Sequence, residues 1–353
     1  ILGKAFSLLM VCVLSLGTFY VAKTNDIIGK ITGGSYRVDK MVVAVRADDS
    51  AEAIEDAMDY SFGVQFEQGG DNMQAAVNDI QNVLGTEINA VECDSVQGQA
   101  QALIDGEVDA IIYNKAYTEL MDGAVVDYSD NVRIIYEMSM KVQLDIGNSG
   151  DNSLTKEPFT VYISGIDVYG EVTETSRSDV NIIAVVNPKT HQILLVTTPR
   201  DYYVEIPGIS KGQNDKLTHA GIYGIDASMA TLSQLYETDI NYYVRLNFTS
   251  LIDIVDILGG VDVYSELEFT TGKESGCIVD VEEEYNHFNG EQALAFSRER
   301  HNLADGDNQR GKNQQAVITA MIKKMLSPTM LLKANGILNQ VGKDIETNVS
   351  QPQ

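Results

Sequence analysis

Residues 179–201 read DVNIIAVVNPKTHQILLVTTPRD, in which two runs of aliphatic, largely β-branched residues flank a polar turn. The turn is NPKT at 187–190, and its Asn and Pro favour a reversal of the chain. Together the two runs and the turn predict a β-hairpin. The apolar run FTVYISGID at 159–167 comes before the hairpin and predicts a further strand.

The segment after the hairpin alternates between helical and strand-like patterns. Helices are expected at 225–236, at 250–258 and from near Asn308, and strands are expected at 242–246 and 261–265. Strands interleaved with helices imply an α/β domain whose sheet is covered on both faces. We place this domain at residues 159–326.

A smaller α/β unit is expected at 41–145, before a boundary rich in Gly, Asn and Ser at 146–157. Strands are expected at 41–45, 109–113 and 132–136, and helices at 51–60, 71–85 and 97–104. The phrase ALIDGEVDAIIYN resembles a lobe of solute-binding proteins, a likeness of low specificity. No polar residues converge in this unit, which favours a spacer or interaction domain over a ligand sensor.

The N-terminal segment is expected to lie in a membrane. Residues 5–22 carry no charge and lie between Lys4 and Lys23. Their number approaches the roughly 20 apolar residues that cross a bilayer as a helix, so we expect a transmembrane helix that anchors the protein in the cell membrane. A cleaved signal peptide is the alternative, but an A-x-A-like cleavage site is not evident. At the other end, residues 327–353 are expected to form a tail with a partial helix.

Composition narrows the function. The 353 residues include 51 acidic and 25 basic ones, which gives a net charge of −26 at pH 7. Such a charge repels a nucleic-acid backbone and argues against nucleic-acid binding. The three cysteines have neither the spacing of a zinc site nor the even number of a disulfide framework. The sequence motifs of nucleotide hydrolysis, zinc proteolysis and serine-esterase chemistry are missing.

Arginine is unevenly distributed along the chain. Six of the nine arginines lie after residue 158, namely Arg177, Arg200, Arg245, Arg298, Arg300 and Arg310. Most fall at expected strand ends or in loops, within GIDVYGEVTETSRSD, TTPRD and SRERHNLADGDNQRGKNQQ. The planar guanidinium group binds phosphate oxygens in a bidentate way. The cluster therefore predicts a diphosphate site, although a single arginine is more often part of a surface ion pair.

Two aspartates accompany these arginines. Asp167 ends one predicted strand, and Asp179 stands at the start of the next. Carboxylates beside a diphosphate would repel it unless a cation lay between them. The pair therefore predicts a hard divalent cation, Mg²⁺ or Mn²⁺, held by one or two carboxylates together with substrate phosphates.

Taken together, these phrases resemble the catalytic domain of the LytR-CpsA-Psr family along nearly all of residues 159–326. The motifs that carry the resemblance are Gly165-Ile166-Asp167, Ser176-Arg177-Ser178-Asp179, Thr198-Pro199-Arg200-Asp201, Lys216-Leu217-Thr218-His219, Leu258-Gly259-Gly260-Val261-Asp262, and Arg298-Glu299-Arg300 with Asp307, Arg310 and Gln314. The small α/β unit upstream makes the capsule and exopolysaccharide attachment branch the most similar one. Val168-Tyr169 and Asn313 are departures, because many members carry an arginine at these places.

The resemblance implies an α/β/α fold with a hydrophobic tunnel for a polyprenyl chain. It implies a diphosphate site lined by Arg200, Arg298, Arg300 and Gln314, Mg²⁺ near Asp167 and Asp179, and supporting roles for Arg177 and Asp307. It also implies that the domain lies outside the cytoplasm of a Gram-positive-type bacterium, with the polysaccharide-synthesis machinery as a further candidate partner.

The activity implied by the resemblance is transfer of a sugar-phosphate polymer from polyprenyl diphosphate to a peptidoglycan hydroxyl, a phosphotransferase-type ligation. The catalytic set would be Arg177, Asp179, Arg200, Arg298, Arg300, Asp307 and Gln314. Either Asp179 or Asp167 is a candidate base. Two other functions stay open, a regulator that senses polyprenyl phosphate lipids and a polyprenyl diphosphate hydrolase that uses water as the acceptor.

Overall fold

The computed structural model describes residues 36–143, 156–170, 172–327 and 345–349. These residues divide into two compact units. Of the described residues, 36–143 and the short segment 173–175 form the N-terminal unit, and 156–170, 172, 176–327 and 345–349 form the C-terminal unit. The predicted transmembrane helix at 5–22 lies outside the described residues. Among the helices that the structure describes, none combines the length and apolar character needed to cross a bilayer.

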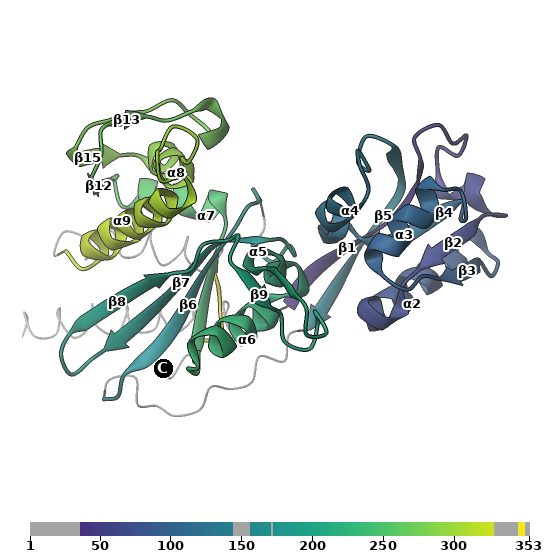
Figure 1. Cartoon of the computed structure of the whole chain (residues 1–353), viewed down its shortest axis with the longest axis horizontal. Coiled ribbons are helices and arrows are strands. Elements are labelled where there is room, and N and C mark those ends of the chain that lie inside the picture. The colour runs from purple at the N-terminus through teal and green to yellow at the C-terminus, as the bar shows by residue number, and fades with distance from the viewer. Residues whose placement is uncertain (1–35, 144–155, 171, 328–344, 350–353) are drawn as a thin grey trace, which may run out of the picture. The chain divides into compact units, whose positions relative to one another are not determined.

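The N-terminal unit is a mixed five-stranded sheet with helices on both faces (Figure 1). The sheet order is β3-β2-β4-β1-β5, with β1 (Tyr36–Arg46), β2 (Ser61–Val64), β3 (Asn89–Glu92), β4 (Ala110–Asn114) and β5 (Val132–Gln143). The helices are α2 (Phe66–Leu84), α3 (Val96–Ile104) and α4 (Thr118–Ala124). Alternate residues of β1 enter the two cores, since Val43 packs with Ile80 of α2 and Val42 packs in the cluster of Leu103 of α3.

One helix predicted in this unit is wrong. The helical spacing over 51–60 corresponds to a single 3₁₀ turn, η1 (Ile54–Ala57). The Asp56 carboxylate accepts the backbone N–H groups of Glu52 and Ala53, which caps the turn at its start. Burying Ile54 and Ala57 is enough to produce the apolar spacing, and the chain enters β2 only four residues later.

The C-terminal unit is built on a second five-stranded sheet, with the order β16-β11-β6-β7-β8. Its strands are β6 (Phe159–Ile166), β7 (Ser178–Asn187), β8 (Gln192–Thr197), β11 (Tyr242–Leu246) and β16 (Glu346–Thr347). The predicted hairpin is confirmed, because β7 and β8 pair antiparallel with Asn187 opposite Gln192. Strand β6 pairs with β7 along one edge and with β11, in parallel, along its other edge.

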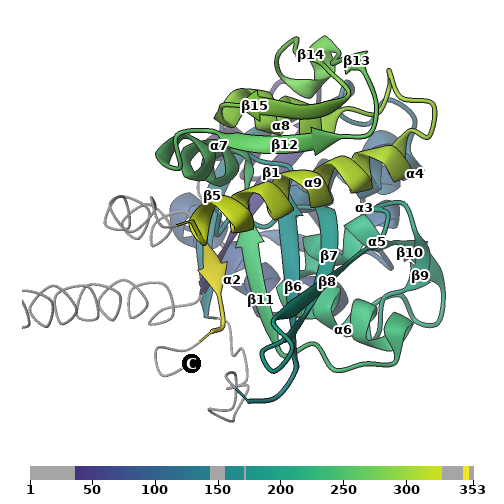
Figure 2. The ribbon, with the colours of Figure 1, turned by 90° about the vertical axis from the view of Figure 1, so that its left-hand side faces the viewer.

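Helices pack on both sides of this sheet, as the strand and helix alternation predicts. One face carries α5 (Leu217–Ala220) and α6 (Ile225–Tyr236), with a core around Tyr162, Leu232 and Tyr243. On the other side lie α7 (Phe248–Ile257), α8 (Gly290–Arg298) and α9 (Asp307–Met325). Figure 2 shows α9 running across strands β11, β6 and β7. Between this helical layer and the sheet there is room for a cavity.

Short strands complete the C-terminal unit. The ribbon of β12 (Val261–Ser265) and β15 (Glu284–Phe288) packs on α9 and shares a core with α7 and α8. Two further pairs are β9 (Tyr203–Glu205) with β10 (Asn214–Lys216), and β13 (Phe269–Thr270) with β14 (Asp280–Val281). The strand predicted at 261–265 is therefore confirmed, although it lies in this ribbon and not in the main sheet.

The segment predicted as a tail contributes a strand to the main sheet. β16 pairs antiparallel with β11. Glu346 of β16 accepts a hydrogen bond from Tyr243 Oη at 3.0 Å and lies 3.2 Å from the guanidinium of Arg245, both charged side chains being only 4% exposed. Arg245 was grouped with the candidate phosphate-binding arginines, but its anionic partner is this glutamate. A buried ion pair of this kind fixes the position of the strand, because either charge left alone would be costly.

Candidate functional site

The two predicted metal-binding aspartates lie at adjoining strand ends. Asp167 follows β6 directly, and Asp179 is the second residue of β7. The β6-β7 register shifts between Gly165 and Ile166, so that Gly165 faces Val180 while Ile166 faces Ser178. Asp179 is the extra residue of this bulge, and a bulge redirects a side chain. A Cβ on Gly165 would lie 2.6 Å from a Val180 methyl group, so only glycine allows this close pairing.

Arg200 projects toward Asp179 from the loop after β8, directly after Pro199. The two side chains form an ion pair and are only 13% and 15% exposed. Although burial lowers the pKa of Arg200, the charges of Asp179 and Asp201 outweigh it and raise that pKa overall. The buried Nε of Arg200 has no hydrogen-bond acceptor among the described residues. This Nε lies 3.9 Å from Asp201 Oδ1, which is an ion-pair distance but too long for a hydrogen bond.

The backbone around Asp179 and Arg200 is held by α5 and the turn after it. The Thr218 backbone N–H donates to Arg200 O at 2.9 Å, and the Thr218 hydroxyl donates to Asp179 Oδ1 at 3.3 Å. A Cβ on Gly221 would lie 2.5 Å from the Ser178 backbone nitrogen, so this glycine allows the turn to pack directly on the start of β7. The motif Lys216-Leu217-Thr218-His219 therefore positions the site.

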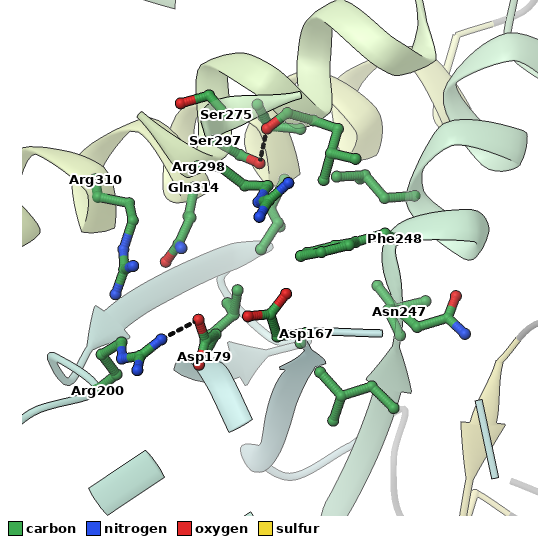
Figure 3. Close-up of a pocket in the computed structure, with 18 of the residues that line it drawn as sticks. Asp167, Asp179, Arg200, Asn247, Phe248, Ser275, Ser297, Arg298, Arg310 and Gln314 are labelled. Carbon is green, nitrogen blue, oxygen red and sulfur yellow. Dashed lines mark hydrogen bonds and ion pairs between the residues drawn. The ribbon is translucent and has the colours of Figure 1, made fainter. Parts of the chain in front are cut away.

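The helical layer presents a second set of cations to these residues. Arg298, the last residue of α8, lies over the ring of Phe248 at 4.4 Å from its centroid. Arg310 and Gln314 lie four residues apart on α9 and so share one face of the helix. In Figure 3 Arg298, Arg310 and Gln314 point toward Asp167 and Asp179 at the strand ends and toward Arg200 in the loop after β8. Arg310 also forms an ion pair with Asp307 in the first turn of α9.

Glu299 organises the loop between Arg298 and Arg300. It is fully buried and accepts hydrogen bonds from the Ser275 hydroxyl and from the backbone N–H groups of Gly272, Arg300 and Asn302. Although burial alone would raise the pKa of Glu299, these hydrogen bonds outweigh it and lower that pKa. Glu299 thus positions the two arginines, a role that the motif Arg298-Glu299-Arg300 did not reveal on sequence alone.

The charges of the two aspartates influence one another. Asp167 lies 3.5 Å from Arg177. Burial raises the pKa of Asp167, and the negative charge of Asp179 adds to the rise in spite of the nearby arginines. The described residues contain no group of three or more His, Cys, Asp and Glu side chains placed to hold a metal ion. Two carboxylates nevertheless fit Mg²⁺, because this ion is commonly held by one or two carboxylates plus substrate phosphates.

A cavity of about 330 Å³ opens at this cluster and extends between the sheet and the helices. At its charged end lie Asp167, Asp179, Arg200, Arg298, Arg300, Arg310 and Gln314. The remainder is largely apolar, and its lining includes Ile163, Val180, Leu246, Leu251, Leu294 and Ile318. The cavity therefore joins a strongly charged end to an apolar interior.

A smaller polar pocket of about 200 Å³ lies on the other side of Arg200 and Arg310. It shares Asp179, Arg200, Arg310 and Gln314 with the larger cavity and adds Thr198, Asp307, Lys312 and Gln315. We call it the polar pocket. Of the catalytic and metal-binding residues predicted from sequence, the structure places all but Arg177 in the lining of one or both cavities, and Arg177 contacts Asp167 instead.

Arg310 is a site residue that the sequence-based catalytic set left out. It lies in one of the matched motifs, and its position four residues before Gln314 on a predicted helix would have indicated a shared face. Burial lowers the pKa of Arg310, while Asp307 opposes the effect. Phe248 was also missed, because an aromatic residue at the start of a helix is usually read as core.

A family model described as the LytR_cpsA_psr family matches residues 126–353, more than half of the chain. A second model, described as DNA polymerase processivity factor, matches residues 4–113, a minority of the chain, and shows a likeness only.

Individual relatives agree with the first model. The chain is 35% identical to the polyisoprenyl-teichoic acid–peptidoglycan teichoic acid transferase TagU of Bacillus anthracis, over 64% of this chain and 73% of that protein. It is 35% identical to TagU of Enterococcus faecalis over 61% of this chain and 67% of that protein. The crystal structure of protein gbs0355 from Streptococcus agalactiae, 27% identical, matches 56% of this chain and 71% of that chain with a TM-score of 0.51. The chain therefore belongs to the LytR_cpsA_psr family.

Proposed function

We propose that this protein transfers a sugar-phosphate polymer from a polyprenyl diphosphate carrier to a hydroxyl group of peptidoglycan. The main support for this proposal is the cavity of about 330 Å³, which has arginines and aspartates at one end and aliphatic side chains beyond them. A lipid-linked diphosphate has the same two parts. The names of the TagU relatives, which describe a polyisoprenyl-linked donor and a peptidoglycan acceptor, support this substrate class.

The charged end suits a diphosphate. Arg200, Arg298, Arg300 and Arg310 supply four positive charges against three carboxylates in the cavity lining, those of Asp167, Asp179 and Glu274. Arg200 lines both this cavity and the polar pocket, so its planar guanidinium is placed to bind phosphate oxygens. Gln314 adds an uncharged amide donor.

The donor set at Asp167 and Asp179 fits Mg²⁺ or Mn²⁺ when phosphates complete the coordination. Such an ion would supply Lewis-acid stabilisation of charge on the phosphate oxygens. The arginines act in the same sense, because preorganised cations stabilise negative charge that develops in the transition state. Glu299 holds the backbone of Arg300 in place, and Thr218 holds the backbone of Arg200.

The proposed reaction is a displacement at phosphorus. The acceptor hydroxyl oxygen forms a bond to the phosphorus that carries the sugar polymer, and its proton passes to a carboxylate or to water. The bond from that phosphorus to the bridging oxygen breaks, and polyprenyl phosphate leaves with the electron pair. The product is a phosphodiester between polymer and peptidoglycan, so this is a phosphotransferase-type ligation.

We further propose a place in the cell for this reaction. A peptidoglycan acceptor requires the C-terminal unit to work outside the cytoplasmic membrane, and an anchor at 5–22 would hold it near the lipid donor. Among wall polymers, capsular or exopolysaccharide chains and teichoic-acid-like chains share the lipid-linked diphosphate chemistry. The N-terminal unit would then be a spacer or a contact for the polysaccharide-synthesis machinery.

The lipid part of the proposal is tested by filling the apolar interior. Ile318→Trp is expected to raise the Kd for a long-chain polyprenyl phosphate at least about tenfold, because excluding two CH₂ groups from the cavity costs roughly 1.6 kcal/mol. Binding of geranyl phosphate, which is much shorter, should change less. The measurement is isothermal titration calorimetry in detergent.

The matched control is Ile278→Trp, since Ile278 is 61% exposed and lies outside the cavity lining. Leu251→Phe is a milder cavity-filling variant for the case that Ile318→Trp does not fold. Unchanged affinity for the long-chain lipid in both folded cavity variants would rule out this cavity as the lipid site.

A further inference from the structure

A third cavity, of about 270 Å³, lies between α9 and the β12-β15 ribbon. Its lining combines two tyrosines, Tyr264 and Tyr285, with amide and charged side chains. We call it the tyrosine groove. We propose that the tyrosine groove binds pyranose sugars of the acceptor glycan strand, an inference that rests on the transferase function proposed above.

The two tyrosines form an exposed aromatic surface. They face each other across the ribbon, with ring centroids 5.4 Å apart and an interplanar angle of 72°. Tyr264 is 49% and Tyr285 is 67% exposed, so most of the aromatic surface is in contact with water. A cross-strand aromatic pair stabilises a ribbon. Its exposed ring surface can also pack on the C–H face of a sugar, because a tyrosine offers an apolar body and a polar tip.

The polar residues of the tyrosine groove suit an uncharged ligand. Asp262 and Glu266 are balanced by Lys312 and Lys323, and Lys312 lies 3.3 Å from Glu266. This balance contrasts with the arginine-rich end of the cavity of about 330 Å³, which we call the lipid cavity, and does not favour a phosphate. The amide nitrogen of Gln315 donates to Thr197 Oγ1 at 2.8 Å and to Leu195 O at 3.3 Å, which leaves its amide oxygen to accept a hydrogen bond from a sugar hydroxyl or acetamido group.

The tyrosine groove continues toward the reacting groups. Lys312 and Gln315 line both the tyrosine groove and the polar pocket, while Arg310 and Gln314 line both the polar pocket and the lipid cavity. Helix α9 thus forms a wall of all three cavities in succession. A glycan whose sugars lie on Tyr264 and Tyr285 could extend along α9 and bring a hydroxyl to the phosphates at Arg200 and Arg310.

The sugars of the polymer on the lipid donor have the same chemistry as those of the acceptor. We assign the tyrosine groove to the acceptor because, in the proposed function, the lipid cavity takes the polyprenyl chain and the diphosphate of the donor. The acceptor must reach the phosphorus from a different direction, and the tyrosine groove offers such an approach along α9.

The test uses two groove variants, the single variant Tyr264→Ala and the double variant that combines it with Tyr285→Ala. The control is Tyr203→Ala, because Tyr203 of β9 is 68% exposed and lies outside the three cavities. The probes are soluble peptidoglycan glycan strands, a water-soluble fragment of the donor polymer, and polyprenyl phosphate. The groove variants should weaken binding of the glycan strands at least about tenfold, in line with the loss of aromatic contact area, and leave polyprenyl phosphate binding unchanged. In transfer assays the KM for the acceptor should rise while kcat stays within about twofold.

The groove proposal and the transferase proposal can fail independently, because glycan binding is measured without turnover. Equal glycan affinity in the groove variants and in Tyr203→Ala would overturn the proposal, whether or not transfer is observed. A lower melting temperature with unchanged glycan affinity would mean that the tyrosine pair serves only the ribbon. Weaker binding of the donor polymer fragment alone would overturn the assignment to the acceptor. Tyr264→Phe, which keeps the ring, should bind glycan like the parent protein.

Discussion

Replacement of Arg200 by alanine is expected to slow polymer transfer by about 10³-fold or more. Arg200 is largely buried, lines both the lipid cavity and the polar pocket, and forms an ion pair with Asp179. Removing one preorganised donor from a transition state costs about 10²–10³ in rate, and removing an arginine from a phosphoryl-transfer site costs about 10³–10⁵. The measurement is the initial rate of release of polyprenyl phosphate in the presence of peptidoglycan.

Three further variants control this experiment. Arg200→Lys keeps the charge but loses the planar fork, so its rate should lie between those of the parent and the alanine variant. Lys189→Ala removes a cation that is 58% exposed at the β7-β8 turn, and it should transfer polymer at the parental rate. Arg298→Ala tests the same cluster from the helical layer, should Arg200→Ala not fold. Transfer within tenfold of the parent in both folded alanine variants would refute a role for the arginine cluster in catalysis.

Asp179→Asn is expected to remove most of the dependence on Mg²⁺ and to slow transfer roughly 10²–10³-fold. Asn keeps the shape of the side chain but loses the charge that a divalent cation needs, and Lewis-acid stabilisation of phosphate oxygens is worth several kcal/mol. Asp167→Asn should act in the same direction, since both carboxylates line the same end of the cavity. Binding of Mn²⁺ in the presence of a polyprenyl diphosphate, followed by electron paramagnetic resonance, gives a readout that does not depend on turnover.

Asp280→Asn is the matched control for this second experiment, because Asp280 is exposed and bonds to the Thr270 hydroxyl away from the cavities. It should bind Mn²⁺ as the parent does. Undiminished Mn²⁺ affinity in both Asp167→Asn and Asp179→Asn would show that the cation, if one is used, is held elsewhere.

The parts of the fold that sequence predicted well are those with local signals. The β7-β8 hairpin rests on two apolar runs and the turn between them, all within residues 179–201, and the predicted helix at 225–236 coincides with α6. The helix at 51–60 was wrong because two buried residues, Ile54 and Ala57, produce the same spacing in one 3₁₀ turn.

Pairing between residues far apart in the chain could not be predicted from the sequence. Glu346 and its partner Arg245 are 101 residues apart, and no local pattern links two residues at such a distance. For the same reason Arg245 looked equivalent to the arginines of the site, although its charge is satisfied inside the sheet. A short strand of two residues, such as β16, has too few positions to show any alternation.

The candidate site was predicted largely through motifs, since residue type and loop position single out Asp167, Asp179, Arg200 and Arg298. What brings them together is the packing of the helical layer over the sheet, which sequence periodicity does not specify. The buried Glu299 illustrates the limit. Its hydrogen bonds to Gly272 and Ser275 position the arginine loop, and only the folded chain reveals them.

The most direct test of the transferase function follows a donor that carries label in the sugar polymer, incubated with the parent protein, Mg²⁺ and peptidoglycan. The account predicts that polyprenyl phosphate is released in step with label that becomes covalently bound to peptidoglycan through a phosphodiester. Release of polyprenyl phosphate with all label remaining in soluble polymer phosphate would contradict transfer and indicate hydrolysis. Tight binding of the donor with no release under these conditions would contradict an enzymatic function and favour a lipid sensor.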